Sequence, residues 1–186
     1  MSAFPRPTPA NVADGRRVTG YCGNIDISKV GYFVLVFLDT EFTSFNEPYL
    51  ISAGLVAGSR EFYFEIAGIT SDICTPFVRQ TVLPLLGGPV LRPIEVSNQL
   101  AAFLAPCGPD VTFFCDAPRY DVELLRPFLS ASLRWNYAVP SFAEAADEDD
   151  FNRTLEEAFQ GRRRHHALDD ARALAQAWRK TSKCPS

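Results

Sequence analysis

The amino-acid sequence predicts an α/β protein with one mixed sheet and helices packed on both of its faces. Three strand-like runs come first, between residues 33 and 66, and the short connections between them favour an antiparallel three-strand meander. Later apolar runs alternate with stretches of helical periodicity, and this order favours parallel strands. At 186 residues the chain is long enough for a single domain with a full hydrophobic core.

Composition and charge limit the possible locations and partners. Residues 1–30 contain several Pro and Gly and little apolar periodicity, so we expect a poorly ordered leader before one folded domain at residues 31–182. No apolar run reaches the roughly 20 residues of a membrane span, and the five cysteines form no CxxC pair, which fits a reducing cytoplasm. Because the net charge is −4, a nucleic-acid partner would have to be bound through a local basic patch.

The first strand is expected at residues 33–38, where six consecutive apolar residues rich in Val and Phe indicate burial on both faces of a sheet. A turn signal at Gly58 separates a second strand at residues 49–57 from a third at residues 60–66. The third run alternates polar with apolar residues, as expected of a strand that has one face toward solvent.

The rest of the chain alternates helices with strands. The expected elements are a helix at residues 77–86 that Gly87-Gly88 ends, a helix at 94–104, a strand at 111–115, a helix at 119–129, a strand at 135–139, and helices at 151–159 and 167–180. Ser71 or Asp72 could cap the first of these helices, and Pro93 suits the first turn of the second. The acidic run at residues 144–150 is expected to be a solvated loop.

Two carboxylates stand at the end of the first expected strand. Because side chains alternate faces along a strand, Asp39 and Glu41 point to the same face and Thr40 points to the other. Two like charges on one face repel each other and lose hydration on burial, and a divalent cation is the usual partner that neutralises such a pair. The alternative is that both are ordinary polar residues leading from a strand into a turn.

Another acidic site lies at the start of the last expected helix. With a rotation of about 100° per residue, Asp170 flanks the apolar face of this helix, whereas Asp169 points away from that face toward water. Asp170 could therefore reach the sheet. His165 precedes the helix in a loop that can move, which suits a residue that transfers protons.

Three short motifs follow one another along the chain: Asp39-Thr-Glu41, Tyr120-Asp121, and His165 five residues before Asp170. Together they resemble the DEDDh family of 3′–5′ exonucleases. The resemblance covers about residues 33–180. It is closest to the compact RNase AS-type exoribonuclease branch, in which segments similar to residues 50–56 and 60–63 recur.

The resemblance implies an RNase H-like fold and a two-metal-ion mechanism with two Mg²⁺, for which Mn²⁺ would substitute. Asp39 would contact both ions. Glu41 and Asp170 would hold the ion that carries the attacking water, and Asp121 would serve the second ion, partly through water. His165 would accept the proton of the attacking water.

The implied substrates are the 3′ ends of single-stranded RNA, or of DNA, and the implied products are nucleoside 5′-monophosphates. Relatives hold the 3′-terminal nucleotide near the positions of Phe42 and Thr43, and Asp116 would lie near the substrate. Phe42 would stack on a base or, alternatively, belong to the core. The arginines at residues 162–164 would meet phosphates or remain solvated. Relatives often form homodimers, so a homodimer is a further expectation.

Several alternatives stay open at this stage. Asp116, at the end of a strand, competes with Asp121 as a metal ligand, and His166 competes with His165 as the proton acceptor. The alternative functions are an RNase H-fold protein that binds nucleic acid without cutting it, a DNA-directed exonuclease, and a hydrolase of small dinucleotides.

Overall fold

The computed structural model describes residues 34–142 and 144–182, and the expected leader at residues 1–30 lies outside this part of the chain. Within the described residues the centre is a six-stranded sheet with the order β4-β3-β2-β1-β5-β6. The strands are β1 (Val34–Phe42), β2 (Leu50–Ala57), β3 (Arg60–Ile66), β4 (Val90–Leu91), β5 (Asp110–Phe114) and β6 (Arg134–Ala138).

The sheet is mixed, which confirms the predicted α/β class. Strands β1, β2 and β3 form the antiparallel meander, and β5 and β6 lie parallel to β1 on its other side. Strand β4 has no counterpart among the predicted elements. It pairs in parallel with β3 through only two residues, Val90 and Leu91, too few for an apolar pattern to reveal.

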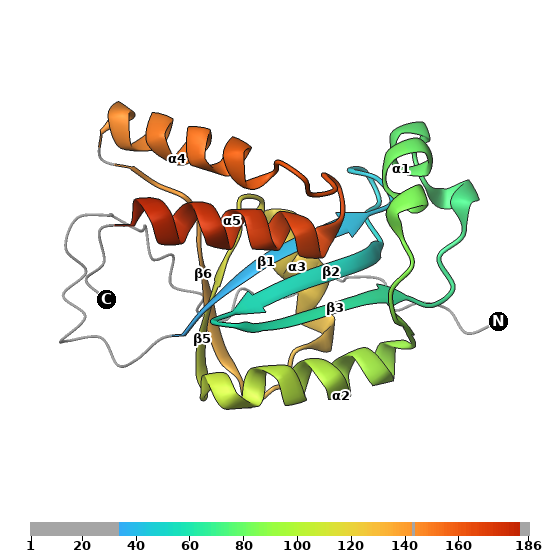
Figure 1. The fold of residues 1–186 in the computed structure, drawn as a ribbon. Coiled ribbons are helices and arrows are strands. Elements are labelled where there is room, and N and C mark those ends of the chain that lie inside the picture. The colour runs from blue at the N-terminus through green and yellow to red at the C-terminus, as the bar shows by residue number, and fades with distance from the viewer. Residues whose placement is uncertain (1–33, 143, 183–186) are drawn as a thin grey trace.

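Helices cover both faces of the sheet (Figure 1). Those of the described residues are α1 (Pro76–Thr81), α2 (Pro93–Leu104), α3 (Pro118–Leu125), α4 (Ala145–Ala158) and α5 (Ala167–Thr181). Neighbouring residues of β1 show the division, because Val36 belongs to the core under α2 and α3, whereas Phe37 belongs to the core under α4 and α5. Strand β1 is therefore buried on both faces, as predicted.

Prolines shorten two of the expected helices. Helices α1 and α3 are shorter than the segments predicted at residues 77–86 and 119–129, and each is followed by a 3₁₀ turn that contains Pro84 or Pro127. Proline has no N–H for an α-helical hydrogen bond, and its ring clashes with the preceding turn. The apolar periodicity continues through these turns, which explains why the pattern predicted longer helices.

The N-cap of α1 also differs from the prediction. It is Thr75, whose hydroxyl oxygen accepts a hydrogen bond from the Val78 N–H at 3.3 Å, while Pro76 takes the first helical position. Ser71 and Asp72 lie in a separate 3₁₀ turn before the helix.

The prediction that the acidic run at residues 144–150 is a loop is wrong. These residues form the start of α4, with Glu144 as the N-cap and Asp147 and Glu148 in the first turn. Negative side chains are favourable there because the helix dipole places partial positive charge at the N-terminus. The charges of the run indicate exposure to solvent, but they do not specify the backbone conformation.

Gly54 in β2 allows α5 to lie very close to the sheet. A Cβ atom at this position would be only 2.3 Å from the backbone N and Cα of Leu168, in the first turn of α5. Only a residue without a side chain permits this approach. Because Gly54 pairs with Asp39 of β1, the same contact brings the start of α5 beside the end of β1.

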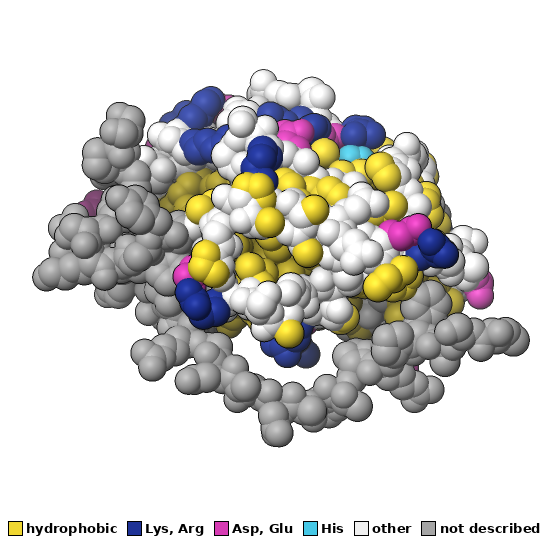
Figure 2. All heavy atoms as spheres, turned by 90° about the horizontal axis from the view of Figure 1, so that it is seen from below, with side chains coloured by type: hydrophobic (Ala, Val, Ile, Leu, Met, Phe, Trp, Pro, Cys, Tyr) yellow, Lys and Arg dark blue, Asp and Glu magenta, His cyan; other side chains and the backbone are white. Residues whose placement is uncertain are grey.

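The opposite face of the molecule carries α2. Figure 2 shows hydrophobic side chains spread among polar ones on this face, and two large apolar residues close to the start of α2, Val90 and Ile94, are 61% and 63% exposed. None of the helices in residues 34–142 and 144–182 combines the length and apolar character that crossing a membrane requires.

Gly54→Ala is expected to lower the free energy of unfolding by about 3 kcal/mol, because the new methyl group would force α5 away from β2. Urea denaturation measures this change. Gly87→Ala is the matched control, since a Cβ there would meet no atom within 4 Å. Equal denaturation midpoints for the two variants would contradict the close contact between α5 and β2.

Candidate metal centre

The acidic side chains of β1 face the start of α5. Asp39 and Glu41 point to the side of the sheet that α4 and α5 cover, while Thr40 points to the side of α2 and α3. The end of β1 and the start of α5 lie side by side in Figure 1, as the contact at Gly54 requires. Carboxylates from a strand and from a helix can therefore meet at this place.

Three of the predicted site residues form one group. Glu41, His165 and Asp170 each offer a ligand atom, and these atoms lie within 4.8 Å of one another, so the group could hold a metal ion. The backbone N–H of His165 donates a hydrogen bond of 3.0 Å to Oδ2 of Asp170, which joins the loop to the first turn of α5. His165 has a φ of 64°, a conformation that residues other than Gly seldom adopt.

The ring of His165 has a neighbour that the sequence did not indicate. Phe77 of α1 lies edge-on to this ring with 5.1 Å between the centroids. Since the Phe77 side chain is 55% exposed, it borders the group from the solvent side. No periodicity in the sequence connects α1 with the loop before α5, so this contact comes from the tertiary structure alone.

Asp121 reaches the same end of β1 from the opposite layer. It lies in the first turn of α3, is nearly fully buried, and accepts hydrogen bonds through Oδ1 from the N–H and the hydroxyl of Thr40, at 3.1 and 2.7 Å. Its Oδ2 accepts a bond from the N–H of Ala117 at 3.3 Å. Thr40, whose side chain points away from Asp39, thus holds Asp121 at the end of the strand.

Two carboxylate oxygens in this cluster have no protein partner. Oδ2 of Asp39 and Oδ1 of Asp170 are buried and accept no hydrogen bond from the residues that the structure describes. An unpaired buried carboxylate oxygen is costly, and such atoms usually bind a metal ion, an ordered water or another donor. Glu41, His165 and Asp170 provide carboxylate oxygens and one imidazole nitrogen, a donor set that suits a divalent cation, and Asp39 interacts with Glu41 and Asp170 through charge.

Burial raises the pKa of all four carboxylates, and repulsion by the other members adds to this effect for Asp39 and Glu41. Loss of hydration, reinforced by Asp121, Asp170 and Glu41, raises the pKa of Asp39 well above its usual range. Burial and the charges of Asp170 and Asp121 raise the pKa of Glu41 to about 8. Burial likewise raises the pKa of Asp121 and of Asp170 to about 7, although hydrogen bonds from Thr40 and from the His165 N–H act in the opposite direction.

The alternatives left open by the sequence can be compared with these positions. Asp116 is exposed at the end of β5, and it acts on the cluster through its charge, raising the pKa of Asp39 and Asp121. His166 is buried and stacks on Tyr63 at 4.6 Å, so its ring belongs to the protein interior. Asp121 contacts β1 through Thr40, and His165 lies beside Glu41 and Asp170.

The predicted substrate contacts differ in their surroundings. Phe42 stacks on Tyr120 with 4.9 Å between ring centroids, and Phe45 meets both rings edge-on, so an aromatic cluster flanks the acidic one. Thr43 is fully buried. Its hydroxyl donates to the carbonyl of Glu47 and accepts from the N–H of Tyr49, which gives the side chain a role in the turn after β1.

The prediction that Asp169 points to water is wrong. Its side chain is only 9% exposed and forms ion pairs with Arg163 and Arg172, each at 2.8 Å. The helical periodicity separates apolar from polar positions, but it does not show that two arginines cover this carboxylate. These ion pairs keep the pKa of Asp169 below its usual value despite burial, whereas the pKa of the adjacent Asp170 is raised.

Neither the comparison with protein-family models nor the comparison with curated proteins gives a match to this chain.

One important residue of the site, Gly54, did carry a signal in the sequence, because an isolated glycine inside a strand pattern indicates close approach of another backbone. Thr40 and Phe77 carried none.

The clustered carboxylates predict an unusual pH dependence of stability. A raised pKa means that the folded protein binds more protons than the unfolded chain, whose carboxyl groups titrate near pH 4. The contribution of these carboxyl groups to the free energy of unfolding is therefore fully present below about pH 4. It is lost as the pH rises through about 7 to 8. In EDTA, the melting temperature of Glu41→Gln should exceed that of the wild type by a margin that grows over this interval.

Divalent ions provide the control for this measurement. Mg²⁺ should raise the melting temperature of the wild type more at about pH 8 than at about pH 5, because the ion competes with protons for the same carboxylates. Mg²⁺ should raise the melting temperature of Glu41→Gln by a smaller amount. A margin between the two proteins that does not change with pH would contradict the buried acidic cluster.

Proposed function

We propose that this protein is a metal-dependent 3′–5′ exonuclease of the DEDDh type that trims the 3′ ends of single-stranded RNA. The observation that carries the proposal is the convergence at the end of β1 of four carboxylates from three elements with one histidine. Two of the carboxylate oxygens are buried and have no partner in the described part of the chain. The proposal includes an RNase H-like fold, which the antiparallel meander followed by two parallel strands supports.

The roles of the residues follow from their surroundings. Asp39, Glu41 and Asp170 are the proposed direct ligands, since their oxygens are crowded and have few or no protein donors. Asp121 already accepts three hydrogen bonds, which favours a contact through water. The bound Mg²⁺ pair would supply positive charge for the phosphodiester and acidify the attacking water.

His165 is the proposed proton acceptor. It lies in the loop before α5, next to Glu41 and Asp170, and its ring is fixed by Phe77 rather than by a hydrogen-bonded partner among the described residues. An uncharged imidazole can take a proton from water and return it to solvent. The exposed position of the loop leaves a route for that return.

Substitution of the central carboxylate tests the proposal. Asp39→Asn should reduce Mg²⁺-dependent release of nucleoside 5′-monophosphates from a 3′-labelled RNA by at least about a hundredfold, since one ligand and its charge are lost. Asp149→Asn on the exposed surface of α4 is the control and should retain full activity. Because Asp39 is repelled by its neighbours, Asp39→Asn should not lower the melting temperature in EDTA.

Full trimming by Asp39→Asn would rule out the proposed chemistry. RNA that is bound but keeps its length in the presence of Mg²⁺ or Mn²⁺ would favour a protein that binds nucleic acid without cutting. Matched DNA and dinucleotide substrates, assayed in parallel, separate the exoribonuclease from a DNA-directed exonuclease and from a dinucleotide hydrolase.

The two adjacent histidines should give opposite effects. His165→Ala is expected to slow cleavage by about 10²- to 10⁴-fold with little change in stability, because the residue is exposed and acts on the proton of the attacking water. His166→Ala is expected to lower the free energy of unfolding by about 1–3 kcal/mol, because a buried ring stacked on Tyr63 is removed. Kinetic assays and urea denaturation of both variants would show the opposite pattern if the assignment were reversed.

A further inference from the structure

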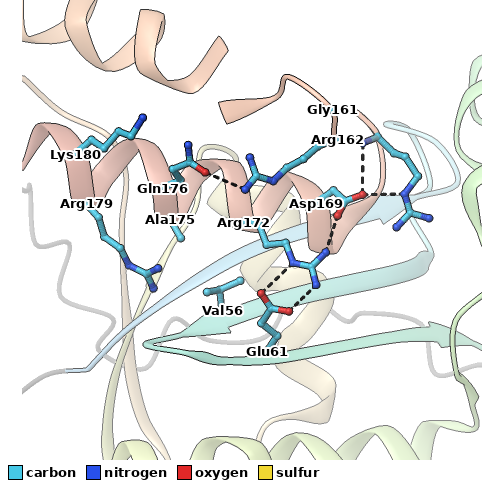
Figure 3. A pocket seen from close by; sticks show the side chains of 11 residues that line it. Val56, Glu61, Gly161, Arg162, Asp169, Arg172, Ala175, Gln176, Arg179 and Lys180 are labelled. Atoms are coloured by element: carbon cyan, nitrogen blue, oxygen red, sulfur yellow. Dashed lines mark hydrogen bonds and ion pairs between the residues drawn. The ribbon is translucent and has the colours of Figure 1, made fainter. Parts of the chain in front are cut away.

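A second feature of the structure lies outside the acidic cluster. A groove of about 830 Å³ runs beside α5, bordered by β2, β3 and the loop before the helix (Figure 3). Five cationic residues line it, namely Arg162, Arg163, Arg172, Arg179 and Lys180. Two carboxylates, Glu61 and Asp169, lie among them. In a chain with a net charge of −4, such a concentration of positive charge calls for an explanation.

The centre of the groove is an ordered network of ion pairs. Arg172 donates to both oxygens of Glu61, at 2.9 and 2.6 Å, and to Oδ1 of Asp169 at 2.8 Å. Arg163 donates to the other oxygen of Asp169 at 2.8 Å. Two carboxylates therefore balance two arginines, and the bidentate geometry fixes the floor of the groove.

For the remaining three cations, the described lining residues include no further carboxylate that would balance their charge. Arg162 donates to the side-chain oxygen of Gln176 at 2.9 Å and to the carbonyl of Ala158, and Arg179 donates to the carbonyl of Gly58 at 2.7 Å. These neutral acceptors orient the guanidinium groups without removing their charge. Arg179 and Lys180 are also exposed, so their charges are accessible from solvent.

The groove begins beside the candidate metal centre. Arg163 lies two residues before His165, and Asp169 is adjacent to Asp170. From Asp169 to Lys180 the groove follows α5 for about 17 Å, at a rise of about 1.5 Å per residue. A flexible polyanion with one end in the metal centre could therefore continue along the helix toward Arg179 and Lys180 (Figure 3).

We propose that this groove binds the phosphodiester backbone of single-stranded RNA, upstream of the 3′ end that enters the metal centre. The direction of the strand rests on the proposed exonuclease function, whereas the binding itself does not. Arginine and lysine side chains match phosphate in charge and in hydrogen bonding. Among the described residues that line the groove none is aromatic, so the groove would hold the backbone without distinguishing bases.

The test removes the two exposed cations at the far end of the groove. Arg179→Ala/Lys180→Ala is compared with Arg126→Ala/Arg134→Ala, which removes the same charge from exposed positions outside the groove. The affinity for a labelled single-stranded RNA of about eight nucleotides is measured by fluorescence anisotropy in EDTA, at several salt concentrations. Vesicles that contain anionic lipid are a second probe, because they also present phosphate.

The groove variant should bind RNA about twentyfold more weakly than the wild type at 0.1 M salt, and the slope of log affinity against log salt should fall by about 1.4. The control variant should resemble the wild type. Equal binding by the two variants, or no binding of RNA by the wild type, would overturn the proposal. Loss of vesicle binding with unchanged RNA binding would assign the groove to a membrane surface and overturn it as well.

This experiment is independent of cleavage, because EDTA removes divalent ions. If RNA is trimmed in Mg²⁺ but the groove variant binds RNA normally, the groove proposal fails and the exonuclease proposal stands. If the groove variant loses RNA binding and neither the wild type nor any variant trims RNA in Mg²⁺, the exonuclease proposal fails and the groove proposal stands.

Discussion

The main constraint on this structure is that several like charges must be held close together at the buried end of β1. Asp39, Glu41, Asp121 and Asp170 come from one strand and two helices. Burial raises the pKa of each, and the charges of the other members raise the pKa of Asp39 and Glu41 further. The core on both faces of β1 holds the strand in place against this repulsion. Divalent cations are the partners that would turn the repulsion into attraction, which is why we connect the cluster with metal-dependent chemistry.

Two neighbouring residues of α5, Asp169 and Asp170, lie in different surroundings. Asp170 faces the acidic cluster and keeps one oxygen without a partner among the described residues, whereas Asp169 is held by two arginines that line the groove. The arginines prevent the charge of Asp169 from adding fully to the crowded cluster. They also fasten the loop that carries His165 to the helix, so the ion pairs that line the groove also support the candidate site.

A close backbone contact on one face of β1 and a side-chain hydrogen bond on the other set the geometry of the site. Gly54 pairs with Asp39 and leaves room for Leu168, so the first turn of α5 lies against β2. On the other face, the hydroxyl of Thr40 fixes Asp121 of α3 at the end of β1. The two helices are thus positioned relative to β1 by one absent side chain and one short hydrogen bond, and the cluster forms where these constraints meet.

The sequence by itself determined the mixed sheet, the antiparallel meander and the facing of Asp39 with Glu41, because these follow from apolar runs and from alternation along a strand. It also indicated which later residues, His165 and Asp170 among them, would meet the strand. Only the tertiary structure decided that Asp169 is buried, that α4 begins within an acidic run, and that Phe77 borders His165. Local periodicity describes one element at a time, whereas these outcomes depend on charges and rings contributed by other elements.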